Sequence, residues 1–143
     1  MASNLYKLEA IAKRLADQSV GTIGSTIYIG NLPETPAACI AVYSDSGTAG
    51  VEVFGSTYAD TIDQPTFRVT VRAARGTYAT GLVKARAVET SLTFSNLTLT
   101  AANGNSTYFL SCKPAGSVQY SGVDAKENPV FNLSFVSMLG HGN

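Results

Sequence analysis

The sequence predicts an α+β fold, in which two helices pack on one face of a mostly antiparallel β-sheet and long loop arms extend from it. Two stretches carry apolar residues at helical spacing, and several others alternate or run apolar over the length of a strand. Glycine, serine and threonine fill the connections. With 143 residues, 45% of them apolar, the chain is expected to form one domain over residues 1–143 with a substantial core.

The amino-terminal residues predict a helix over positions 3–18. Its apolar residues recur at helical spacing and share one stripe, namely Leu5, Leu8, Ile11, Ala12 and Leu15. The stripe is modest, so this helix is expected to dock on a sheet rather than to be buried all round.

Two strands and a long irregular stretch follow. Residues 26–29 predict a short strand, and the nearly continuous apolar run at 38–44 predicts a central strand. Residues 45–65 form the longest irregular stretch, with one short β-like piece at 51–54. A loop of about 20 residues in a compact domain is usually functional or disordered. We therefore expect an arm, residues 44–65, that becomes ordered against a neighbouring molecule.

The middle of the chain predicts a strand over residues 65–73 and a helix over residues 77–92. Alternate strand residues point to opposite faces, Phe67, Val69 and Val71 to one and Arg68, Thr70 and Arg72 to the other. The helix carries a core stripe of Tyr78, Leu82, Ala85, Val88 and Leu92. Gly81 is expected to weaken this helix slightly.

The last third predicts more strands. An edge strand is expected at 93–100, and a strand at 107–113 with Tyr108, Leu110 and Cys112 on one face. Residues 114–129 are expected to form a polar connecting loop. The final strand spans 130–139 and points Phe131, Leu133 and Phe135 inward.

Composition excludes several classes of protein. Charged residues make up only 14% of the chain, and ten basic residues balance ten acidic ones. Such a chain is too hydrophobic to be disordered and lacks the basic excess of a general nucleic-acid binder. Two cysteines are too few for a disulfide scaffold. Charges interrupt every apolar run near the amino terminus, so we expect no signal peptide and no membrane span.

Residues that could carry catalysis or bind metal are scarce. The one histidine, His141, lies in a glycine-flanked tail. Cys39 and Cys112 each stand alone in an expected strand and are interpreted as buried, inert thiols. Asp60 and Asp63 have no acid–base partner in view and are interpreted as solvated loop charges. The sequence therefore predicts no catalytic residue, metal site or cofactor.

The charges are segregated along the chain. Between Leu15 and Phe67 there are six acidic residues and no basic one, whereas Arg68–Arg86 holds five basic residues and no acidic one. Opposed segments of this kind can bind a second copy of the chain, and such contacts close into rings or extend as filaments. The subunit-interface residues predicted on this basis are Arg68, Arg72, Arg75, Arg86, Glu52, Asp60 and Asp63. Two alternatives remain open, namely that the segments pair within one subunit, or that the basic strand faces nucleic acid.

The chain resembles the tail terminator, or tail completion, proteins of long-tailed bacteriophages, a family also described as minor capsid or neck proteins. The resemblance spans most of the chain. It is carried by the amphipathic first helix and by the segments IYIGNLPETPAACIAVY, QPTFRVTVRAARGTYATGLVKARAVETSL and YFLSCKPAGSVQYSGVDAKENPVFNLSFVSML. The pattern is a strand ending in an arginine-bearing turn before a helix, and a Pro-containing strand end and a loop leading into a final strand.

The resemblance implies a structural virion protein in the phage tail or neck that is assembled in the host cytoplasm. A ring of six copies would sit on the head-proximal end of the tail tube, stop tube polymerisation and present a surface to the neck protein of the filled head. DNA would only pass through the lumen. The loops that would reach the tube and neck partners carry Asp45, Tyr58, Tyr120, Asp124 and Glu127.

Other readings stay open. Another neck or connector protein, or a tail tube subunit, would share an α+β sheet with long arms. A small enzyme or ligand-binding domain would need a convergent polar cluster, for example a deep pocket lined by Arg72, Asp60 and Tyr28. A nucleic-acid-binding accessory protein would need the five basic residues to contact phosphates, although no aromatic residues interleave with them for base stacking.

Overall fold

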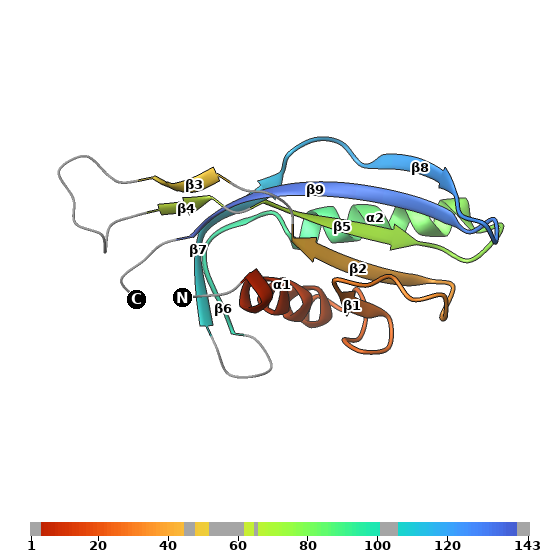
Figure 1. The fold of residues 1–143 in the computed structure, drawn as a ribbon, viewed down its shortest axis with the longest axis horizontal. Coiled ribbons are helices and arrows are strands. Elements are labelled where there is room, and N and C mark those ends of the chain that lie inside the picture. Colours follow the sequence, from red (N-terminus) through yellow and green to blue (C-terminus); the bar gives the residue numbers. More distant parts are fainter. Residues whose placement is uncertain (1–3, 45–47, 52–61, 65, 101–105, 140–143) are drawn as a thin grey trace.

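The computed structural model of the chain describes residues 4–44, 48–51, 62–64, 66–100 and 106–139. In this part of the chain two helices and nine strands follow one another (Figure 1). The helices are α1 (Asn4–Asp17) and α2 (Tyr78–Ser91). The strands are β1 (Ile27–Ile29), β2 (Cys39–Ser44), β3 (Thr48–Val51), β4 (Ile62–Gln64), β5 (Thr66–Arg72), β6 (Phe94–Thr100), β7 (Ser106–Pro114), β8 (Gln119–Val123) and β9 (Pro129–Leu139).

The predicted fold class is confirmed. The strands form one sheet in which every described pair of neighbours is antiparallel except β1 and β2, which are parallel. Most predicted elements match the observed ones to within a residue or two, as helical spacing and strand alternation are strong signals when a segment has one buried face.

Strand β9, with eleven residues, runs through the centre of the sheet and pairs with four other strands (Figure 1). Strands β4 and β5 pair along one of its edges. Several β9 residues that pair with β4 or β5 also pair with β7 or β8. Strands β7 and β8 therefore lie along the other edge of β9. The long strand thereby joins two halves of the sheet, one containing β2, β5 and β8 and the other containing β3, β4, β7 and β6.

The core lies between the helices and one face of the sheet. Across β5 and β9 the inward residues are register partners, and the rings of Phe67 and Phe135 stack with centroids 5.2 Å apart. On α1, the predicted stripe is buried at Leu8, Ile11, Ala12 and Leu15. Burying a large apolar side chain contributes about 1.5–3 kcal/mol, so this face accounts for most of the stability of the helix on the sheet.

The two helices are also joined at one end of this layer. Arg14 of α1 donates a hydrogen bond from Nε to the carbonyl oxygen of Ser91, at 3.0 Å, in the last turn of α2. Its guanidinium carbon lies 5.4 Å from the ring centroid of Phe94. The cation therefore satisfies a helix-end carbonyl and covers an aromatic ring at the same time.

The stripe predicted for α2 needs correction at its first turn. Ala85, Val88 and Leu92 are buried as expected, but Tyr78 is 47% exposed and Gly81 is buried. A Cβ on Gly81 would lie 2.6 Å from Cε1 of Phe131 and 2.8 Å from Cβ of Ala73. The absent side chain thus lets α2 approach β9 closely, a packing role that Gly81 has in addition to the slight weakening of the helix expected from its sequence.

The face predicted for β7 also needs correction. Phe109 and Cys112 are both buried, whereas Tyr108 and Leu110 are half-buried. The pairing of β7 with β9 shifts register between Phe109 and Ser111. A bulge of this kind breaks the alternation of side chains, and period-two reasoning assigns the wrong face on one side of it.

Two predicted loops contain strands. The stretch at 45–65 includes β3 and β4, while residues 52–54 of the expected β-like piece lie outside the described part of the chain. The connection at 114–129 includes β8, which pairs with β9 and has a register shift near Gly122 (φ +91°). These strands are short and polar, so their sequences carry little periodic signal, and an existing sheet edge gives them their pairing.

Candidate interaction surfaces

The basic segment does not form one surface. Arg68 and Arg72 lie four residues apart on β5, on the sheet face opposite the inward Phe67 and Val69. Arg75 lies in the turn that follows β5, and Arg86 lies on the exposed side of α2. The five basic residues between positions 68 and 86 are therefore distributed over the sheet, a turn and a helix.

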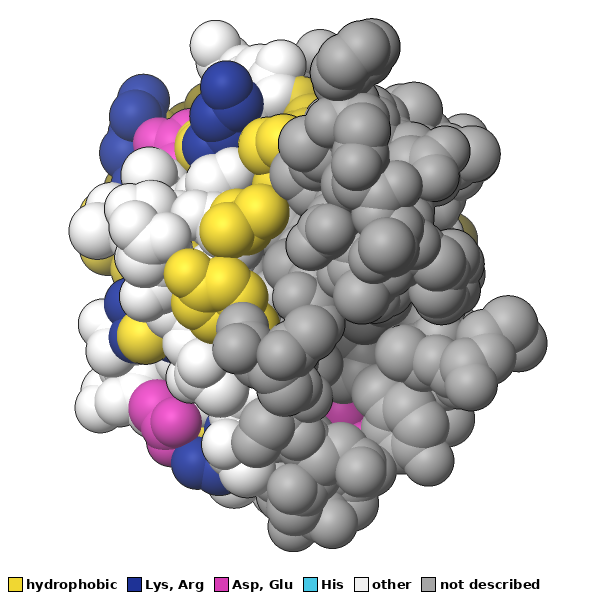
Figure 2. All heavy atoms as spheres, turned by 90° about the vertical axis from the view of Figure 1, so that its left-hand side faces the viewer, with side chains coloured by type: hydrophobic (Ala, Val, Ile, Leu, Met, Phe, Trp, Pro, Cys, Tyr) yellow, Lys and Arg dark blue, Asp and Glu magenta, His cyan; other side chains and the backbone are white. Residues whose placement is uncertain are grey.

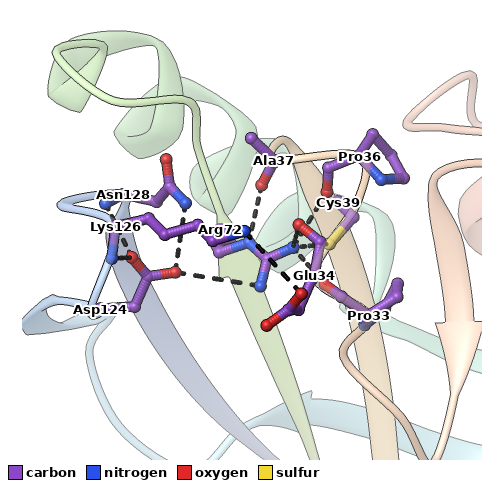
Figure 3. Close-up of polar contacts among 9 residues, drawn as sticks. All are labelled: Pro33, Glu34, Pro36, Ala37, Cys39, Arg72, Asp124, Lys126 and Asn128. Atoms are coloured by element: carbon purple, nitrogen blue, oxygen red, sulfur yellow. Dashed lines mark hydrogen bonds and ion pairs between the residues drawn. The ribbon is translucent and has the colours of Figure 1, made fainter.

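Arg72 is buried, with 6% of its surface exposed, and its guanidinium is surrounded by backbone carbonyls (Figure 3). Its Nε donates to the oxygen of Ala37 at 2.7 Å, and its Nη2 donates to that of Pro36 at 2.9 Å. Nη2 also lies within hydrogen-bonding distance of the carbonyls of Pro33 and Glu34. The arginine thus holds the link between β1 and β2 against the end of β5.

Asp124 faces Arg72 from the loop between β8 and β9, with Oδ2 at 3.9 Å from Nη1 (Figure 3). Its Oδ1 accepts hydrogen bonds from the backbone N–H groups of Lys126 and Asn128, both at 2.9 Å. The bond from the Asn128 backbone is the largest cause that lowers the pKa of Asp124, and the Asn128 side chain, the Lys126 backbone and Arg72 lower it further. Asp124 therefore orders its own loop as an ionised carboxylate and joins that loop to Arg72.

Two exposed ion pairs lie around this buried centre. Arg75 contacts Glu127 at 2.6 Å, and Lys126 lies 3.8 Å from Glu34. Exposed pairs of this kind contribute less than about 1 kcal/mol each. Arg72 and Arg75 therefore pair within their own subunit, but with carboxylates of the loop at 124–128. The alternative that the acidic and basic segments pair with each other within one subunit stays a prediction.

Arg68 has a different environment. Its guanidinium carbon lies 5.1 Å from the ring centroid of Tyr43, its register partner on β2. Burial raises the pKa of Tyr43, and the charge of Arg68 opposes that effect. Within the described residues, Arg68 is exposed and has no carboxylate at ion-pair distance. Its guanidinium is thus an exposed cation positioned by an aromatic ring.

We call the sheet surface around this arginine the open face. It lies opposite the helices and is formed by Tyr43, Arg68, Thr70, Lys113, Asn132 and Ser134. Thr70 donates from Oγ1 to Oδ1 of Asn132 at 2.7 Å, and Asn132 bonds Ser121 in turn. Lys113 is exposed on β7, opposite Val136 of β9. The two charges among these six residues, Arg68 and Lys113, are both positive.

Tyr120, predicted as a partner-binding residue, is 48% exposed on β8. Its ring contacts that of Tyr78 edge-on at 5.0 Å, and both rings contact Phe131. Val123 on the same strand is 55% exposed. Exposed aromatic and apolar side chains of this kind are typical of protein interfaces.

The remaining predicted residues are only partly described. Asp63 lies in β4 opposite Leu139 of β9. Asp45, Glu52, Tyr58 and Asp60 lie outside the residues that the structure describes. Figure 2 shows one end of the molecule, where described hydrophobic side chains gather in a strip and charged side chains lie above and below it.

A cavity of about 440 Å³ lies between the start of α2 and strands β2 and β5. Its lining includes Cys39, whose pKa is raised by burial, and Lys84, which donates from Nζ to the carbonyl of Val20 at 2.9 Å. Arg72 also lines it, but Tyr28 does not. Its two cations, Arg72 and Lys84, are bound to carbonyl oxygens of the chain, and no nucleophile–base pair is found among the described lining residues.

Within the described ranges, no cluster of His, Cys, Asp and Glu side chains could hold a metal ion. Neither α1 nor α2 is long and apolar enough to cross a membrane. The residues that sequence reasoning missed are Tyr43, Lys113 and Asn128. Tyr43 was hidden in an apolar run, although its position in a strand beside an alternating arginine strand was a usable signal.

Comparison with known proteins gives two kinds of match. A family model described as bacteriophage tail terminator protein matches residues 14–137. A chain from the solved virion of a native gene transfer agent particle is 17% identical with a TM-score of 0.60, covering 94% of this chain and 95% of its own. A second solved structure is 14% identical with a TM-score of 0.55, covering 100% of this chain and 99% of its own. No curated protein matches the sequence significantly. At these identities the structural matches show a shared fold.

Proposed function

Because this chain belongs to the bacteriophage tail terminator family, a family of structural tail proteins, we propose that it forms a ring at the head-proximal end of the phage tail tube. The ring, of six copies, stops tube polymerisation and joins the tail to the neck. The observation that carries this proposal is the family match over residues 14–137, which extends from the end of α1 to the end of β9. The whole chain then acts as one terminator domain.

The described surfaces support a structural role of this kind. The buried Arg72 and the partly exposed Asp124 hold loops in place, and the exposed features are a cationic sheet face and an aromatic cluster. Positioned loops and exposed aromatic groups suit contacts with other proteins better than chemistry on a small substrate.

The partners of the ring are copies of this chain, the tail tube protein and the neck or head completion protein. DNA passes through the lumen only during ejection, and assembly takes place in the host cytoplasm before the protein is part of the virion. Arg68 and Arg86 are the proposed interface cations, with Glu52, Asp60 and Asp63 as acidic partners.

Arg72 and Arg75 enter this interface indirectly, because they hold the loop at 124–128 through Asp124 and Glu127. That loop, Tyr120 on β8 and the residues Asp45 and Tyr58 are the proposed contacts with tube and neck proteins.

The test is to mix the purified protein with isolated tail tubes and to examine it by electron microscopy and by mass. We expect closed rings at one end of each tube, and tubes that no longer elongate when free tube subunits are added. Filaments of the protein alone would identify a tube subunit instead. Binding to filled heads without any binding to tubes would identify a different neck or connector protein.

A further inference from the structure

We propose that the open face, centred on Arg68, binds the acidic segment at residues 45–63 of a second copy of this chain. This inference rests on the proposed ring and names the contact that joins one subunit to the next. The residues on the receiving side are Arg68, Tyr43 and Lys113. The residues on the donating side are Asp45, Glu52, Asp60 and Asp63.

The first support comes from a survey of cations whose side chains are described. Six of them already bind a carboxylate or a carbonyl in their own chain, namely Lys13, Arg14, Arg72, Arg75, Lys84 and Lys126. Three have no such partner among the described residues: Arg68, Arg86 and Lys113. Two of these three lie on the open face, so this face has positive charge that its own described surface does not neutralise.

The second support is the way in which Arg68 is held. The ring of Tyr43 lies 5.1 Å from its guanidinium carbon and restricts the side chain to the sheet surface. A stacked guanidinium keeps its planar set of N–H donors free for a carboxylate, which it can bind through two parallel hydrogen bonds. Thr70 and Asn132 beside it are hydrogen-bonded to each other and fix the neighbouring surface.

The third support is charge complementarity. Four described acids already pair with cations of their own chain, namely Asp17, Glu34, Asp124 and Glu127. Residues 45–63 carry four acids and no lysine or arginine. This segment is therefore the matching counter-charge that the chain itself supplies.

The contact is heterologous, because the open face of one copy receives a different part of the next copy. Contacts of this type close into a ring when the rotation between subunits permits it. Every copy carries one open face and one acidic segment. In a closed ring each open face is therefore bound by the segment of a neighbouring copy.

The test uses two variants of the full-length protein. The face variant carries Arg68→Glu, and the segment variant carries Glu52→Lys with Asp60→Lys. Each alone places like charges in the contact, so we expect about a tenfold loss of assembled rings, measured by light scattering and by microscopy of tube ends. When the two are mixed in equal amounts, rings with alternating variants contain only opposite-charge contacts, and assembly should return.

A matched control is Lys13→Glu, which changes the net charge by the same amount as Arg68→Glu but lies on helix α1, opposite the open face and outside the proposed tube and neck contacts. Rings should form as they do in the wild type, and circular dichroism should show all variants folded. Mixing the face variant with the segment variant can restore only charge pairs that form between two copies of the chain. Failure of the mixture to assemble would show that the segment pairs with Arg68 of its own chain, and the inference would then be wrong.

Normal assembly of the face variant would also overturn this inference while leaving the proposed ring intact. If the wild type itself forms no ring, with or without tubes, the proposed function and this contact fail together. The wild-type measurement therefore separates the two failures.

Discussion

Arg72 shows how one residue can be assigned to the right face and the wrong role. Alternation along its strand predicts that it lies opposite Val71, and it does. The sequence cannot show that the carbonyls of Pro33, Pro36 and Ala37 surround that position, because those residues are separated from Arg72 by more than thirty positions. A cation that would otherwise be solvated is thereby buried and hydrogen-bonded, as an interior charge requires.

Replacing this side chain tests its role within the chain. Arg72→Met removes every donor from the surrounding carbonyls and leaves Asp124 without its buried partner. We expect the free energy of unfolding to fall by about 2–4 kcal/mol, since unsatisfied buried polar groups are costly. Chemical denaturation followed by circular dichroism measures the change.

The matched control is Arg75→Met, which removes an arginine from an exposed ion pair with Glu127. Its effect should stay below about 1 kcal/mol. Equal effects of the two substitutions would contradict a structural role for the buried arginine.

At the scale of elements, sequence patterns work where one face is buried and fail where pairing is imposed by the rest of the sheet. Helix α1 and strand β9 were predictable, because each has a continuous inward pattern over many residues. The face of β7 was not, because a bulge between Phe109 and Ser111 changes its phase. Strand β8 was missed, because its five residues read as a glycine-containing loop.

Helix α2 gives the sharpest test at this scale. Gly81→Ala raises intrinsic helix propensity by about 1 kcal/mol, but the added Cβ meets Phe131 and Ala73 at 2.6 and 2.8 Å. Since those neighbours belong to the packed core, we expect a net destabilisation of about 1–3 kcal/mol. Thermal or denaturant unfolding measures it.

Gly116→Ala is the companion substitution, because a Cβ at Gly116 meets nothing within 4 Å. The unfolding midpoint of this variant should be close to that of the wild type. A Gly81→Ala protein that is more stable than the wild type would show that α2 does not need its close approach to β9.

At the scale of the whole molecule, neutrality conceals an uneven distribution of charge. The net charge is zero, yet the described charges near Arg72 pair within the chain and those of the open face do not. The sequence predicted the segregation and the resemblance predicted the family. Which of the two arginines is buried could be known only from the fold, since Arg68 and Arg72 lie on the same strand and face.

Salt offers a test at this scale. The screening length falls from about 10 Å at 0.1 M salt to about 3 Å at 1 M. Rings held by the open face should therefore dissociate as salt rises, while the unfolding midpoint of the subunit changes little because its core is apolar. Mass photometry across a salt series measures the assembled fraction. Rings that grow more abundant with salt would indicate an apolar contact instead.

The central position of β9 has a consequence for how this protein can vary. Both halves of the sheet take their alignment from the same eleven residues, so inserting or deleting one residue near the middle would turn the inward side chains of one half outward relative to the other. Changes of length are tolerable only in the connections beyond its two ends. We therefore expect a one-residue deletion within β9 to prevent folding, where the same deletion in a connection beyond its ends would not.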